Sequence, residues 1–579
     1  MKRGLSLILC FLCIFSLSAC QGPTPFDPNA VGSPSVDIDT SFGKPENEMF
    51  TARDLDASYD AARATRILLN GRTISCDASD VSISGANATI LGGGTYILSG
   101  TLEGTITVHA GDTEKPHIIL DGVDITAAGA CILVLSADKV VLTLAEGSEN
   151  ILVNDGSFAP IGGVNVDGAI FSTADLTLNG TGALSIYSVG GHGIVSNDDL
   201  VITGGDYMID ALGHALKGND SVRVCGEPLF SLTAEKDGVH AENNGDEARG
   251  FVYIAGGSFT ANVGGDAISA SAHMQITDGT FALTTGGGHE NGKEHESGFG
   301  GGPGGPGGPG RPMPRVASTD GTVSAKGLKA GGGLLIEGGS FTLDTADDAL
   351  HSNTDVVVKG GSFAIKTGDD ALHADVSLAI FGGTIDVSVS YEGLEAKHVE
   401  MLGGNVKLVC EDDGINAAGG NDGSGAGGGY DDIFNHGDST GTVNIAGGEL
   451  YMNASGDGID ANGTFTMSGG KVTICGPTEG DTAVLDYDKS AIITGGYFIG
   501  TGSQMMAQSF SRESTQGVIA LSVGNQAAGT RVTLSGGAAS IDYTPILPYQ
   551  ILVISTPDMV KGEEYTVTVG TLSGKFQAY

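Results

Sequence analysis

The sequence predicts an all-β protein, a right-handed parallel β-helix with rungs of about 22 residues and a C-terminal β cap. Two patterns on one shared period carry this prediction: a glycine pair before a short β-type run, and a four-residue motif that begins with an acid. A third observation is that no helical periodicity of useful length follows the N-terminal apolar segment.

The glycine pairs set the period. Pairs that open at Gly338, Gly360, Gly382 and Gly403 are 22, 22 and 21 residues apart. The runs behind them, such as SFTLDT and SFAIKT, are rich in Val, Ile, Phe and Thr. Such runs are typical strands, with side chains pointing alternately inward and outward. Short strands and glycine corners on this period are what one turn of a three-stranded β-helix needs.

The second pattern is an acid followed by a small, an aliphatic and a polar residue. Clear copies are Asp348–His351, Asp370–His373, Glu392–Glu395, Asp413–Asn416 and Asp457–Asp460, with Asp237–His240 and Asp266–Ser269 upstream. Degenerate copies occur at Asp167, His192, His214, Lys326 and Asp481. A motif that keeps the rung period must occupy the same position on successive rungs.

The N-terminus predicts a bacterial lipoprotein. Lys2 and Arg3 precede an apolar run over residues 5–17, which is too short to span a bilayer and has signal-peptide length. The run ends in LSAC, which resembles a lipobox. Residues 1–19 are therefore predicted as a signal peptide and Cys20 as the lipidated residue, giving an extracellular, membrane-anchored protein. An ordinary signal peptide with an incidental cysteine is the alternative.

The rest of the chain divides by composition. Residues 20–48 are rich in Pro, Gly, Ser and acids and predict a flexible tether. Residues 49–499 predict the β-helix, with insertion loops at about 286–320 and 419–441. Residues 500–579 lose the corner pattern and predict the β cap over the open end. The first loop holds His289, Glu290, Glu294 and His295, but no strand-to-helix context supports a phosphate or metal site there.

Composition narrows the class of partner. A net charge of -41 argues against nucleic acid and anionic membrane surfaces and suits a surface protein that collects cations. Because 40% of residues are hydrophobic, the chain is not a disordered acidic tail. No CxxC pair follows Cys20, so a zinc site is unsupported. Three cysteines end strand-like runs and are predicted as buried thiols, with a disulfide framework as the alternative: Cys225, Cys410 and Cys475.

The acidic motif predicts calcium. Equivalent positions on neighbouring rungs lie about 4.8 Å apart, where two charges repel by roughly 3.5 kcal/mol at an effective dielectric of 20. Protonation, basic neighbours or a hard cation must offset this repulsion, and Ca²⁺ accepts carboxylate oxygens in flexible geometry. A solvated acidic face, or acids that cap backbone N–H groups at corners, is the alternative. The predicted Ca²⁺ ligands are Asp347, Asp348, Asp369, Asp370, Glu392, Glu395, Asp412, Asp413, Asp457 and Asp460.

Longer stretches carry a resemblance to a known family. They include Arg53-Asp54-Leu55 with Tyr59, GTYILSGTL, ADKVVLTLAEGSENIL, HGIVSNDDLVITGG, DDALHSN, YEGLEAKHVEM, DDGINAAGG, GDGIDANG and SFSRESTQ. The chain resembles bacterial secreted carbohydrate-binding lipoproteins first described as a clostridial cellulose- and pectin-binding protein with a pectate-lyase-like β-helix. The resemblance implies calcium on acidic rungs and binding of cellulose-like or polygalacturonate-like polymers without established catalysis. His214 and the segment 480–488 depart from the pattern, and His214 stands where the repeat expects an acid, so no cation site is expected there.

Three functions compete. The first is a non-catalytic, calcium-dependent carbohydrate-binding surface protein, with a polysaccharide as partner. The second is a polysaccharide lyase or hydrolase on the same fold. Lysines that could act as a base lie near the acidic motif, namely Lys326, Lys329 and Lys397, but no arginine lies in the column of acids. The third is a structural adhesin. Aromatic candidates for stacking on sugars are few, namely Tyr391, Tyr430, Phe434 and Tyr487.

Overall fold

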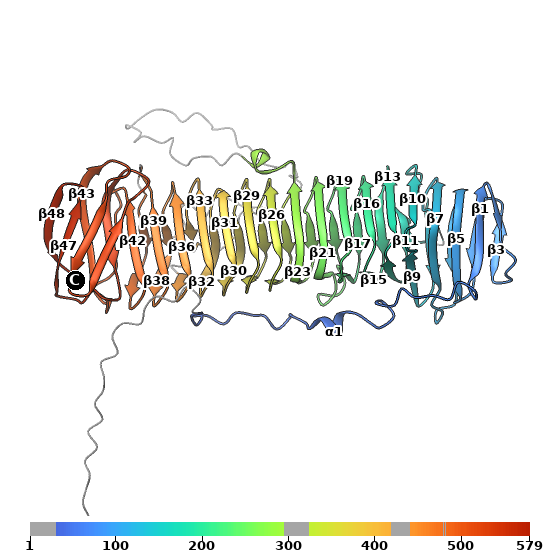
Figure 1. The fold of residues 1–579 in the computed structure, drawn as a ribbon, viewed down its shortest axis with the longest axis horizontal. Helices are drawn as coiled ribbons and strands as arrows, with labels where there is room; N and C mark the ends of the chain where they lie inside the picture. Colours follow the sequence, from blue (N-terminus) through green and yellow to red (C-terminus); the bar gives the residue numbers. More distant parts are fainter. Residues whose placement is uncertain (1–30, 162, 294–323, 419–439, 479, 481) are drawn as a thin grey trace, which may run out of the picture.

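The computed structural model describes residues 31–161, 163–293, 324–418, 440–478, 480 and 482–579. These residues form strands almost throughout, with two short helical turns, α1 (Glu46–Met49) and η1 (His289–Asn291). The strands follow one another along an elongated body, and most pair in parallel (Figure 1). The predicted all-β class with parallel strands is confirmed. In this described part of the chain, no helix is long and apolar enough to cross a membrane.

Strands about three places apart in the sequence pair in parallel, which divides the stack into three faces. Face 1 consists of β4 (Asn87–Ile90), β6 (Ile106–His109), β8 (Ile132–Ser136), β11 (Gly168–Ser172), β14 (His192–Ser196), β17 (Leu216–Gly218), β20 (Val239–Ala241), β22 (Ile268–Ala270), β24 (Leu328–Ala330), β27 (Leu350–Ser352), the first halves of β30 (Leu372–Ile380) and β32 (Leu394–Met401), β34 (Ile415–Asn416), β37 (Ile459–Ala461) and β40 (Leu485–Tyr487).

Face 2 follows face 1 along the chain. It consists of the first halves of β5 (Thr95–Glu103) and β7 (His117–Ala127), β9 (Lys139–Leu144), β12 (Asp175–Gly180), β15 (Asp199–Ile202), β18 (Ser221–Val224), the first halves of β21 (Phe251–Val263) and β23 (Met274–Thr285), β25 (Leu334–Ile336), β28 (Asp355–Val358), the second halves of β30 and β32, β35 (Gly441–Ile445), β38 (Gly463–Met467) and β41 (Ser490–Ile493).

Face 3 closes each rung. It consists of β1 (Thr65–Gly71), the second halves of β5 and β7, β10 (Glu149–Asn154), β13 (Ala183–Ser188), β16 (Asp206–Ala211), β19 (Leu229–Ala234), the second halves of β21 and β23, β26 (Ser340–Thr345), β29 (Ser362–Thr367), β31 (Thr384–Val389), β33 (Asn405–Cys410), β36 (Glu449–Ala454), β39 (Lys471–Cys475) and β42 (Tyr497–Gly502).

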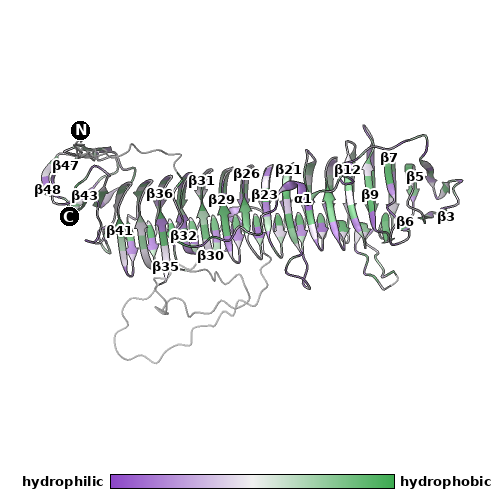
Figure 2. Ribbon diagram, turned by 90° about the horizontal axis from the view of Figure 1, so that it is seen from below, coloured by the Kyte–Doolittle hydropathy of each residue, from purple (hydrophilic) through white to green (hydrophobic). Residues whose placement is uncertain are grey.

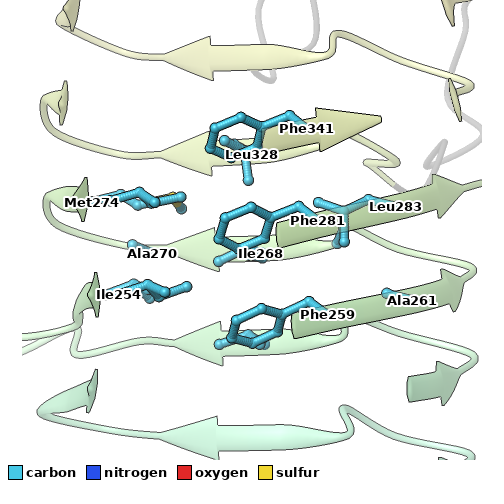
Figure 3. Packing of buried hydrophobic residues seen from close by; sticks show 14 of the residues in the cluster. Ile254, Phe259, Ala261, Ile268, Ala270, Met274, Phe281, Leu283, Leu328 and Phe341 are labelled. Atoms are coloured by element: carbon cyan, nitrogen blue, oxygen red, sulfur yellow. The ribbon is translucent and has the colours of Figure 1, made fainter. Parts of the chain in front are cut away.

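The apolar core lies between the three faces. Phe259, Phe281 and Phe341 occupy one register position on neighbouring rungs, and their ring centroids are 5.1 and 4.6 Å apart (Figure 3). The predicted glycine pairs lie at the corners that lead into these strands. Gly339 has a φ of 104°, a conformation that residues with a side chain rarely adopt. A Cβ atom there would lie 3.1 Å from the carbonyl oxygen of Gly279.

Antiparallel pairs occupy both ends of the stack. At the N-terminal end, β1 pairs with β2 (Thr73–Ser75), and β3 (Val81–Ser84) pairs with β4. At the other end, β46 (Tyr549–Ser555) pairs antiparallel with β42 and with β43 (Val518–Gln526). A four-stranded antiparallel sheet follows, made of β45 (Ala539–Tyr543), β44 (Val532–Gly536), β47 (Glu564–Val569) and β48 (Leu572–Gln577).

A strap formed by residues 31–56 lies across face 2. Figure 2, seen from below, shows this segment with α1 in front of the strands. At one end the backbone N–H of Ser35 donates to both carboxylate oxygens of buried Glu400. In the middle, Phe42 stacks on His273 with ring centroids 4.5 Å apart. At the other end, Lys139 Nζ lies 2.8 Å from the carboxylate of Asp54.

The structure corrects the predicted flexible tether for residues 31–48, because these contacts hold them against face 2. The physical reason is that the segment, although polar in composition, supplies side chains and N–H groups that satisfy buried charges of the stack. Glu400 and Asp54 are both fully buried, and a buried carboxylate needs hydrogen-bond or ion-pair partners. Most of the two predicted insertion loops, residues 294–323 and 419–439, lies outside the described residues.

Candidate functional site

The acidic motif forms a column at the corner between face 3 and face 1. On each rung the acid stands between a strand of face 3, such as β26, and the next strand of face 1, such as β27. Leu350, Leu372, Leu394 and Ile415 are register partners in parallel pairs. The acids two residues before these partners, Asp348, Asp370, Glu392 and Asp413, are therefore aligned along the stack, as the shared period predicted.

One oxygen of several column acids caps a backbone N–H of the next rung. Asp348 Oδ1 accepts from the N–H of Asp370 at 3.2 Å, and Asp370 Oδ1 accepts from the N–H of Glu392 at 3.3 Å. Asp413 Oδ1 accepts from the N–H of Asp457 at 2.5 Å. These contacts match the capping role that the sequence left open as an alternative. Each carboxylate still has a second oxygen that must be solvated, protonated or paired.

Lys326 neutralises the upstream end of the acidic stretch. Its Nζ lies 2.7 Å from Asp347 Oδ1 and 2.6 Å from Asp348 Oδ2, and its side chain is 1% exposed. Burial opposes the charge on Lys326, but Asp348 and Asp347 outweigh that effect and raise its pKa. Burial likewise opposes the charge on Asp348, yet Lys326 holds the pKa of that carboxyl well below its usual range. This rung therefore carries its own cation.

His373 contacts two carboxylates of the next rungs, but burial, then the charge of Glu395, still raises the pKa of Asp370 well above its usual value. Its Nδ1 lies 3.2 Å from Asp370 Oδ2 and 2.8 Å from Glu395 Oε2, and the ring is fully buried. Burial lowers the pKa of His373, but hydrogen bonds to Asp370, Asp375 and Glu395 raise it well above its usual value. A protonated imidazole is thus a second internal cation. Neighbouring His351 stacks on it at 4.9 Å and contacts Asp348 at 2.9 Å.

Beyond His373 the carboxylates lie among other acids. Burial, then the charges of Asp457 and Asp412, raises the pKa of Asp413 well above its usual value. Burial, then the charges of Asp457 and Asp486, raises the pKa of Asp460 to about 7. Within the described ranges, no lysine, arginine or histidine forms an ion pair with Asp413 or Asp460. Among the described residues, Asp413 and Asp460 therefore have no partner that corresponds to Lys326 or His373.

Glu392 lies in the column between Asp370, which contacts His373, and Asp413, which lies among other acids. Its Oε1 accepts a hydrogen bond from Asn416 Nδ2 at 3.1 Å, whereas its Oε2 is buried and has no hydrogen-bond partner among the described residues. Burial, then the charge of Asp370, raises the pKa of Glu392 well above its usual value. A buried oxygen without a partner is costly and marks a place where an additional group fits.

Three carboxylates beyond this point could hold one ion. Ligand oxygens of Asp413, Asp457 and Asp460 all lie within 4.8 Å of one another. An all-oxygen donor set of this kind fits Ca²⁺, which binds six to eight oxygens in flexible geometry and takes the remaining ones from water or a ligand. Asp347, Asp348 and Asp369 form a similar group, but Lys326 already occupies two of them.

The remaining predicted ligands, Asp369, Glu395 and Asp412, lie next to groups already described. Asp369 borders the Lys326 rung, where burial, then the charges of Asp348 and Asp370, raises its pKa to about 9. Glu395 pairs with His373, and Asp412 accepts a hydrogen bond from the Tyr391 hydroxyl. A pocket of about 210 Å³ opens beside Asp347 and Asp369 and is lined further by Asn291 and Lys293.

Histidines replace the acid on two earlier rungs. His192 Nδ1 accepts from the N–H of His214 at 2.8 Å, and His214 Nδ1 accepts from the N–H of Asp237 at 3.1 Å. Burial, then the nearby His214, lowers the pKa of His192 to about 3, so the ring is a neutral acceptor. The place of these histidines in the repeat was visible in the sequence. The sequence did not reveal that an imidazole nitrogen can accept the backbone N–H that a carboxylate oxygen accepts on other rungs. His214, Asp237 and His240 still form a group of closely spaced ligand atoms.

The structure also places the other residues that the sequence singled out, outside the acidic motif. Tyr487 is partly buried, and its hydroxyl donates to the carbonyl of Ser509 at 2.8 Å. His289 Nδ1 lies 2.8 Å from Asp344 Oδ1, so this histidine is hydrogen-bonded to the stack at the base of its loop. Cys225, Cys410 and Cys475 are buried free thiols, as predicted. Residues outside the described ranges are Cys20, Glu294, His295, Tyr430, Phe434 and Asp481.

Comparison with known proteins identifies the family of this chain. The chain matches the model of the carbohydrate-binding domain-containing protein family over residues 84–371 and 370–545, and it belongs to that family. A carbohydrate-binding domain-containing protein of Acetivibrio thermocellus is 30% identical over 289 residues, which cover 49% of this chain and 92% of the relative. A solved structure described as the polysaccharide lyase-like protein from C. thermocellum, in a gadolinium derivative, is 30% identical. Its alignment covers 39% of this chain and 92% of that chain, with a TM-score of 0.37.

Proposed function

We propose that this protein is a non-catalytic carbohydrate-binding lipoprotein of the bacterial surface that binds a plant-type polysaccharide with the help of Ca²⁺. The polysaccharide would be polygalacturonate-like or cellulose-like, and the membrane would be contacted only through lipid on Cys20. Membership of the carbohydrate-binding domain family supports the class of ligand. We also propose that the parallel stack is a right-handed β-helix, which the pairing of strands about three places apart supports.

The observation that carries the calcium proposal is the contrast along the column. Lys326 and His373 each form ion pairs with two carboxylates, whereas Asp413 and Asp460 have no basic partner among the described residues, and only acids are among the charges that raise their pKa values. Mutual repulsion at this spacing favours a structure with a bound cation. A Ca²⁺ ion that receives fewer than six protein oxygens would keep positions open for a carboxylate of the polysaccharide.

A calcium titration of thermal unfolding tests this proposal. Ca²⁺ at a hundredfold excess over its Kd should stabilise the folded chain by about 2.7 kcal/mol, and chelator should remove the effect. The double variant Asp413→Asn with Asp460→Asn keeps the side-chain size and should lose most of the calcium response. Asp206→Asn with Asp210→Asn removes two exposed carboxylates on face 3 and serves as the matched control. A calcium response that survives in the first variant would refute this site.

The alternative of catalysis is tested in the same preparation. A lyase needs a base that can accept a proton, but the pKa of Lys326 is raised and Lys329 lies 3.5 Å from the carboxylate of Asp266. These contacts favour binding over elimination. Incubation with polygalacturonate and Ca²⁺, followed by absorbance of unsaturated uronate products, should give no signal. Product formation would replace the binding proposal by a polysaccharide lyase.

A further inference from the structure

Exposed apolar side chains gather on one part of face 3. In the described part of the stack between residues 95 and 502, eight large hydrophobic residues are exposed, and seven of them fall between residues 151 and 229. Six of the seven belong to consecutive rungs on β10, β13, β16 and β19, or to the turn directly after these strands: Ile151, Tyr187, Val189, Met208, Leu212 and Leu229. We call these six residues the apolar patch.

Strand register places the patch on one flat surface. Ile151 is the register partner of Ser185, which is the partner of Met208 on the next rung. Tyr187 lies two residues along β13, beside Asp210. Four rungs about 4.8 Å apart and six residues at about 3.3 Å each give a surface of roughly 14 by 20 Å, or about 300 Å². Figure 1 shows the four strands side by side.

The size of the patch argues against a second copy of this chain as its occupant. A stable dimer buries about 800 Å² on each partner, well above the roughly 300 Å² of the patch. The core of such an interface is also depleted in charged residues. Here the register brings Asp206 beside Leu229 and Asp210 beside Tyr187, so carboxylates are interleaved with the apolar groups.

The mixture of groups fits a sugar chain. A pyranose ring presents C–H groups on its faces, which pack on an aromatic ring and on aliphatic side chains, and hydroxyl groups at its edges. Ser185, Ser231 and Thr233 lie between and beside the apolar residues and can donate or accept hydrogen bonds with such hydroxyls. Asp206 and Asp210 are exposed acceptors at the same level.

The negative charge of this surface favours neutral polysaccharides over acidic ones. Asp206, Asp210 and Glu149 are exposed on this surface, and the chain as a whole carries a net charge of -41. A polymer of uronic acids would be repelled unless a cation bridged it. The groups of closely spaced metal-ligating side chains found among the described residues do not include any of these three acids. The surface therefore favours a polymer without carboxylates.

We propose that the apolar patch is a binding surface for a neutral polysaccharide chain, separate from the acidic column and independent of calcium. The proposal rests on the carbohydrate-binding class of the proposed function, but not on its calcium site or on its acidic ligand. The sugar rings would lie flat across β10, β13, β16 and β19, with Tyr187 and Met208 beneath the ring faces. Asp206 and Asp210 would accept hydrogen bonds from sugar hydroxyls.

Affinity electrophoresis of the full mature chain tests this surface. The native protein is run through gels that contain hydroxyethyl cellulose, as a soluble neutral glucan, in the presence of chelator. Retardation is expected for the wild type, and Tyr187→Ala with Met208→Ser should weaken the Kd by about tenfold or more. Val376→Ser removes an exposed apolar side chain outside the patch and should leave the affinity unchanged. Unfolding midpoints of all three proteins verify the fold.

Each outcome separates this proposal from the proposed function. Loss of glucan binding in the patch variant, with an unchanged calcium response, supports the patch. No retardation of the wild type, or equal retardation of the patch variant, overturns it, whatever the calcium titration shows. A dimer that light scattering detects in the wild type and not in the variant assigns the patch to self-association and also overturns it. Failure of the calcium response alone refutes the acidic column and leaves the patch intact.

Discussion

Replacing Lys326 by methionine probes how the acidic column is kept stable. The Lys326 ammonium lies 2.7 and 2.6 Å from two carboxylates, and neither its side chain nor that of Asp348 has more than 1% exposure. At an effective dielectric of 20 each contact amounts to about 6 kcal/mol of attraction, most of which desolvation offsets. Removing one partner leaves buried charges uncompensated, so Lys326→Met should cost about 3–5 kcal/mol.

The same substitution should increase the stabilisation of the folded chain by Ca²⁺. Without Lys326, the oxygens of Asp347, Asp348 and Asp369 become an all-carboxylate group like that of Asp413, Asp457 and Asp460. The variant should therefore gain more stability from Ca²⁺ than the wild type does, by about 2.7 kcal/mol at a hundredfold excess over Kd. Urea unfolding with and without Ca²⁺ measures both effects.

A surface ion pair provides the control for Lys326. Lys359 pairs with Glu337 at 3.1 Å, but both side chains are more than a third exposed. Lys359→Met should therefore cost about 1 kcal/mol at most and should leave the calcium response as it is. A Lys326→Met protein as stable as the wild type, or one with no added calcium response, would refute the view that Lys326 substitutes for a cation.

Three further predictions concern other parts of the molecule. Burial opposes the charge on Asp54, but Lys139, Thr177 and Thr51 lower its pKa to about 2. The contribution of this pKa shift, about 2 kcal/mol at neutral pH, should be lost as the pH falls from about 4 to about 2, and acid titration of Asp54→Asn should lack that step. Cys20→Ala should release the protein from membranes, and a processed, membrane-bound variant in cell fractions would contradict lipidation. Asp370→Asn with Glu392→Gln should reduce calcium-dependent polygalacturonate binding in pull-down assays, and equal binding by folded variant and wild type would argue against ligand contact at these rungs.

The fold class was predictable because its determinants are local and repeated. Each glycine pair marks a corner that needs a positive φ, as at Gly339, and each following run alternates inward and outward residues. The regular spacing of Asp348, Asp370, Glu392 and Asp413 along the chain is enough to predict that these acids align on successive rungs. Repetition makes these features visible, since one rung alone would resemble many other β proteins.

The electrostatics of the column could not be read from the repeat. Lys326 and His373 both stand within the motif, yet only the structure shows that their nitrogens point at two carboxylates each. Capping by His192 and His214 depends on which ring nitrogen faces the next rung. The strap was missed for a related reason: its composition is that of a tether, and its partners Glu400 and Lys139 lie far away in the sequence.

The strap also has a consequence for the order of assembly. Ser35 and Glu400 are 365 residues apart in the chain, whereas paired strands of the stack are much closer in sequence, with 22 residues between Ser340 and Ser362 and 60 residues between Ile268 and Leu328. Neighbouring rungs can thus form as the chain emerges, but the strap has no complete docking surface until β32 and β35 exist. Contacts of such high sequence separation form slowly, because the intervening chain must first lose its freedom. The first described residues of the chain are therefore expected to dock last, and face 2 stays open to other molecules until they do.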